Sequence, residues 1–151
     1  MQISVIGAAE ATREEYDAAL AVGRLIAESG GILLCGGDGG VMEAACRGAR
    51  EQGGRTVGIV PGIGNGNAYV DIVIRTGLGQ ARNVLVAQSG DAVIAVGGSY
   101  GTLSEIAVAL KMGLRVFGLK TWEIPGVAAC ATPEEAVRGA VASAREHCTG
   151  T

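Results

Sequence analysis

Residues 92–105 are Ala-Val-Ile-Ala-Val-Gly-Gly-Ser-Tyr-Gly-Thr-Leu-Ser-Glu. The first five are apolar and partly β-branched, which predicts a buried strand over 92–96. The glycines that follow predict a tight loop, and the pattern beyond them predicts a helix over 102–112. A buried strand that passes through a short glycine loop into a helix is the repeating unit of a parallel sheet covered by helices on both faces.

The same alternation extends along the chain in both directions. We expect further strands or extended segments over 3–6, 32–35, 55–60, 70–75 and 115–119, and helices after Thr12, over 41–52, over 80–89 and from Thr132 toward His147. Thr12 and Thr132 each stand three residues before a Glu, which is the spacing of an N-terminal capping box. The 151 residues therefore predict an α/β fold, a single Rossmann-like domain over 1–151 with a doubly wound parallel sheet.

Composition argues against several classes of protein. The chain has 12 Lys and Arg against 15 Asp and Glu and no basic stretch, so nucleic acid is not the expected partner. The sequence has neither the ~20 apolar residues of a membrane span nor the start of a signal peptide, so we expect a cytoplasmic protein without a membrane partner. The four cysteines lack CxxC spacing and high density, which predicts reduced thiols and no metal site.

Two glycine loops follow predicted strands, at the edge where open α/β sheets bind ligands. The candidate phosphate- or nucleotide-binding residues are Gly36, Gly37, Asp38, Gly39 and Met42 around the first loop, and Gly98, Ser99, Tyr100, Gly101 and Thr102 around the second. Free N–H groups at a helix N-terminus, glycine backbone and hydroxyl groups can together hold a phosphate. Glycines at such positions also serve tight turns and close packing alone, and both interpretations stay open.

Other features narrow the chemistry. The sequence contains no GxxxxGK[ST] and no GxGxxG after its first strand, which disfavours ATP hydrolysis and ordinary NAD binding. Residues 62–67, Gly-Ile-Gly-Asn-Gly-Asn, predict an exposed loop that can close over a ligand. Cys35 either faces a ligand or ends its strand as a buried thiol. Trp122 and Met112 are interpreted as packing residues.

The run 98–105 resembles the PGGxGTxxE motif of the LONELY GUY (LOG) nucleoside-monophosphate phosphoribohydrolases. Residues 35–42 resemble the earlier glycine loop of that superfamily, 57–61 its strand that ends in Pro, and 80–83 its Arg-containing helix start. The similarity covers roughly residues 1–120. Within the superfamily, the short chain and the Gly-Gly before Ser-Tyr-Gly-Thr most resemble the molybdenum cofactor carrier-like branch, long labelled possible lysine decarboxylases.

The resemblance implies that Glu105 and Arg82 are the catalytic pair and that Asn83 joins the glycine loops in binding the nucleotide. A carboxylate and a guanidinium suit the cleavage of an N-glycosidic bond. Glu105 can equally be a residue that only favours the first turn of its helix, and Arg82 can be solvated. Ser99 replaces a motif glycine, and Asp38 stands in a loop that is usually richer in glycine.

Two functions stay open from the sequence. One is hydrolysis of a nucleoside 5′-monophosphate with release of the free base, which requires no cofactor. The other is non-catalytic carriage of molybdenum cofactor, a phosphorylated pterin. In both, the partner is a small phosphorylated ligand, either an AMP-like nucleotide or molybdenum cofactor, and the resemblance implies a homodimer or a higher homo-oligomer. Pyridoxal-phosphate-dependent lysine decarboxylation is not expected, because neither Lys111 nor Lys120 lies in a segment that resembles a pyridoxal phosphate site.

Overall fold

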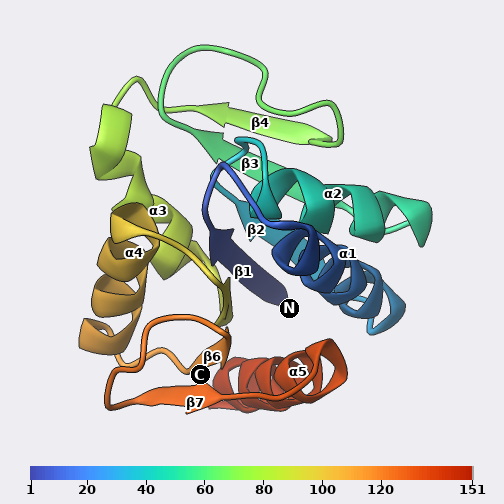
Figure 1. Ribbon diagram of the computed structural model, residues 1–151, viewed down its shortest axis with the longest axis vertical. Coiled ribbons are helices and arrows are strands. Elements are labelled where there is room, and N and C mark those ends of the chain that lie inside the picture. The colour runs from blue at the N-terminus through green and yellow to red at the C-terminus, as the bar shows by residue number, and fades with distance from the viewer. Residues whose placement is uncertain (151) are drawn as a thin grey trace.

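The computed structural model describes residues 1–150 and contains a seven-stranded sheet between two layers of helices (Figure 1). The strands are β1 (Gln2–Gly7), β2 (Ile32–Cys35), β3 (Thr56–Val60), β4 (Ile72–Arg75), β5 (Ala92–Val96), β6 (Val116–Leu119) and β7 (Val127–Ala129). Every neighbouring pair runs parallel, in the order β4-β3-β2-β1-β5-β6-β7. The prediction of an α/β fold with a doubly wound parallel sheet is confirmed.

Helices make the crossovers that parallel strands require. They are α1 (Arg13–Glu28), α2 (Val41–Glu51), the short 3-10 helix η1 (Gly79–Ala81), α3 (Arg82–Ser89), α4 (Tyr100–Lys111) and α5 (Pro133–Thr149). Helices α1, α2 and α5 cover one face of the sheet, and α3 and α4 cover the other (Figure 1). Within residues 1–150, none of these helices combines the length and the apolar character needed to cross a bilayer.

The capping box at the start of α1 forms as the sequence predicts. The Thr12 hydroxyl oxygen accepts a hydrogen bond from the Glu15 N–H at 3.2 Å, and the Glu15 carboxylate accepts one from the Thr12 N–H at 3.3 Å. At the start of α5, the Thr132 hydroxyl accepts from the Glu135 N–H at 3.2 Å. Both helices therefore begin where a local side chain replaces missing backbone partners.

A few elements differ from the sequence-based prediction. Strand β7 was not predicted, because its three residues, two half-buried and one exposed, give too short a pattern to distinguish from a loop. Helix α4 begins at Tyr100, two residues earlier than expected, and the predicted helix over 80–89 begins as η1. The interpretation of Met112 as a packing residue is wrong, because its side chain is 51% exposed at the end of α4.

Apolar residues fill the space on both faces of the sheet. Ile3 and Val5 of β1 belong to the cluster under α1, α2 and α5, whereas Ile6 belongs to the cluster under α3 and α4. Alternate residues of a strand point to opposite faces, so one central strand contributes to both clusters. With both faces occupied by the core, the edge at the carboxyl ends of the strands is where polar side chains can gather.

Helices α1 and α2 approach each other backbone to backbone. A Cβ atom added to Gly48 of α2 would lie 2.1 Å from the carbonyl oxygen of Leu20, and one added to Gly23 of α1 would lie 1.9 Å from that of Ala45. Carbonyl oxygens in helices cannot yield as flexible side chains do. Each glycine is therefore a requirement of the packing between these two helices.

We expect Gly48→Ala to lower the free energy of unfolding by about 2–4 kcal/mol, because the added methyl group forces α1 and α2 apart. At an unobstructed helix position a Gly→Ala substitution stabilises the fold, because alanine has the higher helix propensity. A loss of stability in Gly48→Ala would therefore indicate the close contact between α1 and α2. Chemical denaturation measures it, with Gly64→Ala as the matched control, since a Cβ there meets nothing within 4 Å. Equal stability of the two variants would contradict the close contact.

Candidate functional site

The strand order reverses between β1 and β5. The chain passes from β1 outward through β2, β3 and β4, and then returns to place β5 on the other side of β1. The loop after β1 consequently leads to α1 on one face, and the loop after β5 leads to α4 on the other (Figure 1). Loops that diverge in this way leave a crevice at the carboxyl edge of the sheet, where open α/β proteins bind their ligands.

A pocket of about 280 Å³ occupies this crevice, and we call it the switch-point pocket. It is built from loops and helix starts that are distant in the sequence. Its lining residues are Gly7, Ala8 and Ala9 at the end of β1 and just after it, Asp38 and Met42 after β2, Pro61 after β3, Gln80, Arg82 and Asn83 at η1 and α3, and Ser99, Gly101, Thr102 and Glu105 after β5.

Most of the residues singled out from the sequence converge on this pocket. Those that line it are Asp38, Met42, Arg82, Asn83, Ser99, Gly101, Thr102 and Glu105. Five others lie in the adjoining loops without lining it, namely Gly36, Gly37, Gly39, Gly98 and Tyr100. Sequence analysis missed Gly7, Ala8, Ala9, Pro61 and Gln80. The only available signal for the first three was their place after the first strand, because that loop is not rich in glycine.

Arg82 is the buried cation of the pocket. Its Nη2 lies 2.8 Å from Oδ2 of Asp38, and the residue is only 6% exposed, which rules out the interpretation of Arg82 as a solvated side chain. Its Nε has no hydrogen-bond partner among the described residues. Buried donors are nearly always paired, so this unpaired nitrogen is unusual and marks the guanidinium group as only partly satisfied within the described chain.

Gly36 makes room for this guanidinium group. A Cβ atom at Gly36 would lie 1.9 Å from Nη1 of Arg82. Gly36 therefore acts on the pocket indirectly, because the absence of a side chain lets the guanidinium group of Arg82 approach the backbone closely. This is a packing role, and it places Arg82 beside Asp38.

Glu105 is also 6% exposed, and it lies in the second turn of α4 because the helix starts at Tyr100. A role limited to the first turn of that helix is therefore excluded. The pKa of the Glu105 carboxyl group is raised from its usual 4.5 to about 8, chiefly because the group is buried; the charge of Arg82 opposes this shift, and the charge of Asp38 adds to it. At neutral pH the group is mainly protonated and can donate a hydrogen bond.

The start of α4 adds donors to the pocket. The N-cap residue Ser99 makes no capping hydrogen bond with its own side chain in the described chain, so its hydroxyl group remains available. At the start of α2, by contrast, the first N–H group already has a partner within the chain, because Val41 donates to the carbonyl oxygen of Ala8 at 3.1 Å. The α4 N-terminus, with Ser99, Thr102 and Arg82, therefore suits an anionic group.

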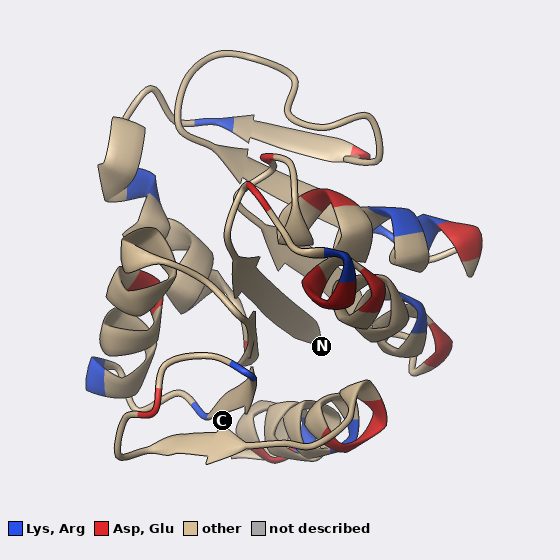
Figure 2. Cartoon of the chain, viewed as in Figure 1, with Lys and Arg blue, Asp and Glu red and all other residues tan. Residues whose placement is uncertain are grey.

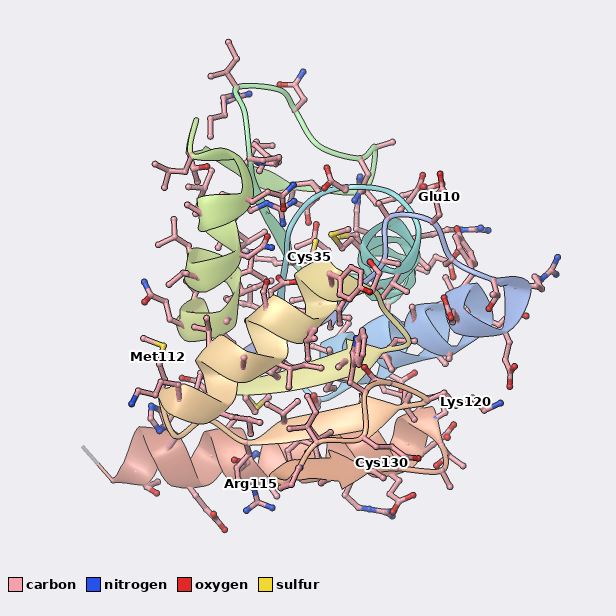
Figure 3. All side chains as sticks on the ribbon, turned by 60° about the vertical axis from the view of Figure 1, so that its left-hand side comes forward. Glu10, Cys35, Met112, Arg115, Lys120 and Cys130 are labelled. Atoms are coloured by element: carbon pink, nitrogen blue, oxygen red, sulfur yellow. The ribbon has the colours of Figure 1, made fainter. Side chains whose placement is uncertain are left out.

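Cys35, labelled in Figure 3, is not among the residues that line the pocket. It is fully buried, its Sγ lies 3.4 Å from Sγ of Cys46, and it accepts a hydrogen bond from the N–H of Gly37 at 3.3 Å. Contact with Cys35 and burial together raise the pKa of the Cys46 thiol. Of the two possibilities left by the sequence, the buried thiol at the end of a strand is the one observed.

Comparison with known protein families and sequences gives consistent matches. The model of the SLOG cluster4 family matches residues 1–147. An uncharacterized protein of Archaeoglobus fulgidus is 52% identical over 145 residues, 95% of this chain and 96% of that protein. A probable cytokinin riboside 5′-monophosphate phosphoribohydrolase of Oryza sativa subsp. japonica is 31% identical over 106 residues, which are 66% of this chain and 47% of that protein.

Solved structures resemble the chain over nearly its whole length. The molybdenum cofactor binding protein of the phototrophic bacterium Rippkaea orientalis has a TM-score of 0.88 and 38% identity, and the match covers 93% of this chain and 95% of that one. The Moco carrier protein of Chlamydomonas reinhardtii has a TM-score of 0.84 and 35% identity, with coverage of 99% and 98%.

The raised pKa of Glu105 predicts how stability depends on pH. Below about pH 4.5 both the folded and the unfolded chain hold this proton; between there and about pH 8 only the folded chain does. The free energy of unfolding therefore falls as the pH rises through this window. We expect Glu105→Gln, which has no proton to lose, to become more stable relative to the wild type by up to a few kcal/mol over the window.

Chemical denaturation at a series of pH values measures this difference. Glu28→Gln is the control, because that carboxyl group is exposed at the end of α1. A gap between wild type and Glu105→Gln that stays constant from pH 5 to 9 would show that Glu105 titrates as an ordinary carboxyl group.

Proposed function

Because the chain belongs to the SLOG cluster4 family, whose model matches residues 1–147, we propose that it binds a phosphorylated pterin, molybdenum cofactor, in the switch-point pocket and carries it without cleaving it. The resemblance to the LOG superfamily and its molybdenum cofactor carrier-like branch is confirmed. The proposal is supported by two structures named for binding or carrying this cofactor, which are similar over more than nine-tenths of each chain.

The observation that carries the proposal is the buried guanidinium group of Arg82. One nitrogen is held by Asp38, and another has no partner among the described residues. Arg82 lines the pocket, so a phosphate oxygen there can accept from its guanidinium group, and the N-terminus of α4 and the hydroxyl of Thr102 supply further donors. The carboxylate of Asp38 is 43% exposed, so it can also accept from N–H groups of a pterin ring.

The raised pKa of Glu105 argues against one hydrolytic role, that of an ionised carboxylate beside the ribose. A carboxylate that stabilises the positive charge of an oxocarbenium ion must be ionised. Burial keeps Glu105 mainly protonated at neutral pH, since its pKa is raised to about 8. A neutral carboxyl group in a pocket is suited to a hydrogen bond with a ring carbonyl or ring nitrogen instead.

A second function is favoured by one specific observation: Arg82 and Glu105, the catalytic pair implied by the resemblance, line the same pocket. In that function, a protonated Glu105 donates a proton to the base that leaves a nucleoside 5′-monophosphate. The likeness to the phosphoribohydrolase of Oryza sativa supports it over two thirds of this chain, which is about half of that enzyme's length.

Calorimetric titration with neopterin monophosphate, a stable phosphorylated pterin, tests the binding proposal. We expect Arg82→Gln to weaken binding about 10- to 100-fold, because a charge-assisted hydrogen bond to phosphate is lost. The matched control is Arg138→Gln, at an exposed position of α5 away from the pocket. Failure of the wild-type protein to bind the compound, or equal affinities of the two variants, would overturn the proposed site.

Hydrolysis is tested by incubating the protein with AMP and other nucleoside monophosphates and following free base by chromatography. Carriage without cleavage predicts that no base is released while the ligand stays bound. Release that disappears in Glu105→Gln would instead establish the phosphoribohydrolase, and the carrier function would then be rejected.

A further inference from the structure

Two aromatic side chains lie together at the start of α4. Tyr100, the first residue of the helix, and Trp122, the only tryptophan of the chain, have ring centroids 6.0 Å apart and ring planes inclined by 32°. The Tyr100 side chain is 80% exposed. A large ring held this far out of the core, in a chain with only 3% aromatic residues, is not explained by packing.

The loop that carries Trp122 is fastened to the loop after β5. The Trp122 Nε1–H donates to the carbonyl oxygen of Ser99 at 3.1 Å, and the Thr121 hydroxyl donates to that of Gly97 at 2.6 Å. Lys120, just before them, has a φ of 48°, which is costly for a residue with a side chain. The backbone turn at Lys120 and the two hydrogen bonds fix the position of the tryptophan ring.

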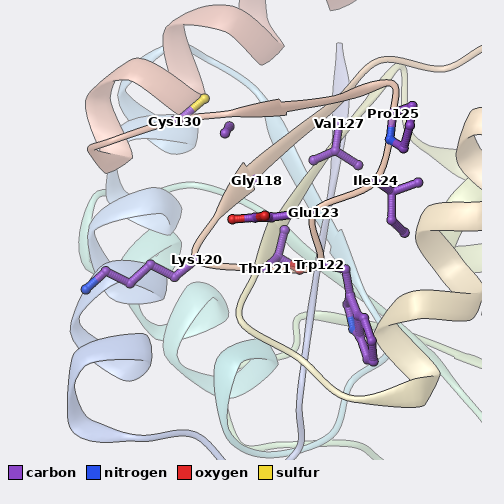
Figure 4. A pocket seen from close by; sticks show the side chains of 10 residues that line it. Gly118, Lys120, Thr121, Trp122, Glu123, Ile124, Pro125, Val127 and Cys130 are labelled. Atoms are coloured by element: carbon purple, nitrogen blue, oxygen red, sulfur yellow. The ribbon is translucent and has the colours of Figure 1, made fainter.

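Core packing holds this loop only in part, since Trp122 and Ile124 are partly buried against the cluster under α3 and α4. Beneath it lies a hollow of about 390 Å³, lined by residues that include Gly118, Thr121 and Pro125 (Figure 4). Figure 4 shows the ring of Trp122 extending from the loop toward α4. The interpretation of Trp122 as a packing residue is therefore incomplete, because its ring also supports that of Tyr100.

This aromatic pair stands at the rim of the switch-point pocket. Ser99 and Gly101, the two neighbours of Tyr100, both line the pocket, and Ser99 also accepts the Trp122 hydrogen bond. Side chains in a helix incline toward its N-terminus, so a residue at the first position projects beyond the helix end. The Tyr100 ring thus stands next to the donors that suit a phosphate.

We propose that Tyr100, supported by Trp122, is the platform on which the bicyclic heteroaromatic ring of the ligand stacks while its phosphate lies in the switch-point pocket. The two protein rings are too close for a third ring to enter between them, because stacked rings lie about 3.5 Å apart. The ligand ring therefore uses the exposed face of Tyr100. The phosphate part of this inference rests on the proposed function; the ring part rests on the aromatic pair.

The chemistry of the platform selects a class of ligand. The face of an aromatic side chain stacks with any flat heteroaromatic ring, so it accommodates both a pterin and a purine. A sugar phosphate that has no heteroaromatic ring gains no affinity from such stacking. Stacking of a base on an aromatic side chain contributes about 1–3 kcal/mol, which corresponds to about 5- to 150-fold in affinity.

Tryptophan fluorescence, excited selectively over the three tyrosines, tests the platform, because Trp122 is the only tryptophan of the chain. The ligands are neopterin monophosphate, AMP and ribose 5-phosphate. We expect the first two to quench the emission, and we expect ribose 5-phosphate to bind, as measured by calorimetry, without quenching. Tyr100→Ala should weaken the two ring-bearing ligands about 5- to 150-fold and leave ribose 5-phosphate unchanged. Tyr100→Phe should retain their affinity.

Met112→Ala is the matched control, since Met112 is an exposed apolar residue at the opposite end of α4. Ring-bearing ligands that bind no more tightly than ribose 5-phosphate, or an affinity that Tyr100→Ala does not change, would overturn the platform. If no phosphorylated compound binds, the proposed function fails, and adenosine then decides the platform alone. Quenching by adenosine that is lost in Tyr100→Ala would support it, and unchanged emission would reject it.

Discussion

The reversal of strand order between β1 and β5 is the constraint on which the site depends. In a parallel sheet all strands end on the same edge, and both faces are closed by helices. Where the order reverses, the loops after β1 and β5 lead to opposite faces, and a crevice remains between them. Residues as far apart in the sequence as Gly7 and Glu105 meet there.

The crevice contains few charged groups, and the positive charge of Arg82 is balanced by the negative charge of Asp38. Arg82 is almost fully buried, and Asp38, its ion-pair partner, is partly exposed; Glu105 is kept mainly neutral by burial. Along α1 and α2, basic and acidic residues are intermixed and do not form a stripe of positive charge (Figure 2). Affinity for an anion would therefore arise from local donors, the guanidinium group and the start of α4, and not from a general positive field.

The fold was predictable from the sequence because its signals are local. Thr12 with Glu15 marked the start of α1, and the apolar run over 92–96 marked β5. Strand β7 was not predicted because its three residues pair only with β6, at the end of the sheet, and none of them is fully buried. The switch-point pocket was predictable in part: the glycine loops pointed to it, whereas the loop after β1 carries no chemical signal of its own.

By itself, the sequence determined the parallel architecture, the helix starts and the presence of Arg82 and Glu105 as candidates. Only the tertiary structure decided that Arg82 pairs with Asp38, that burial raises the pKa of Glu105, and that the ring of Trp122 lies beside that of Tyr100. The physical reason is one of range. Hydrophobic periodicity and capping act over a few residues, whereas burial, pKa and ring contacts depend on which distant segments the strand order brings together.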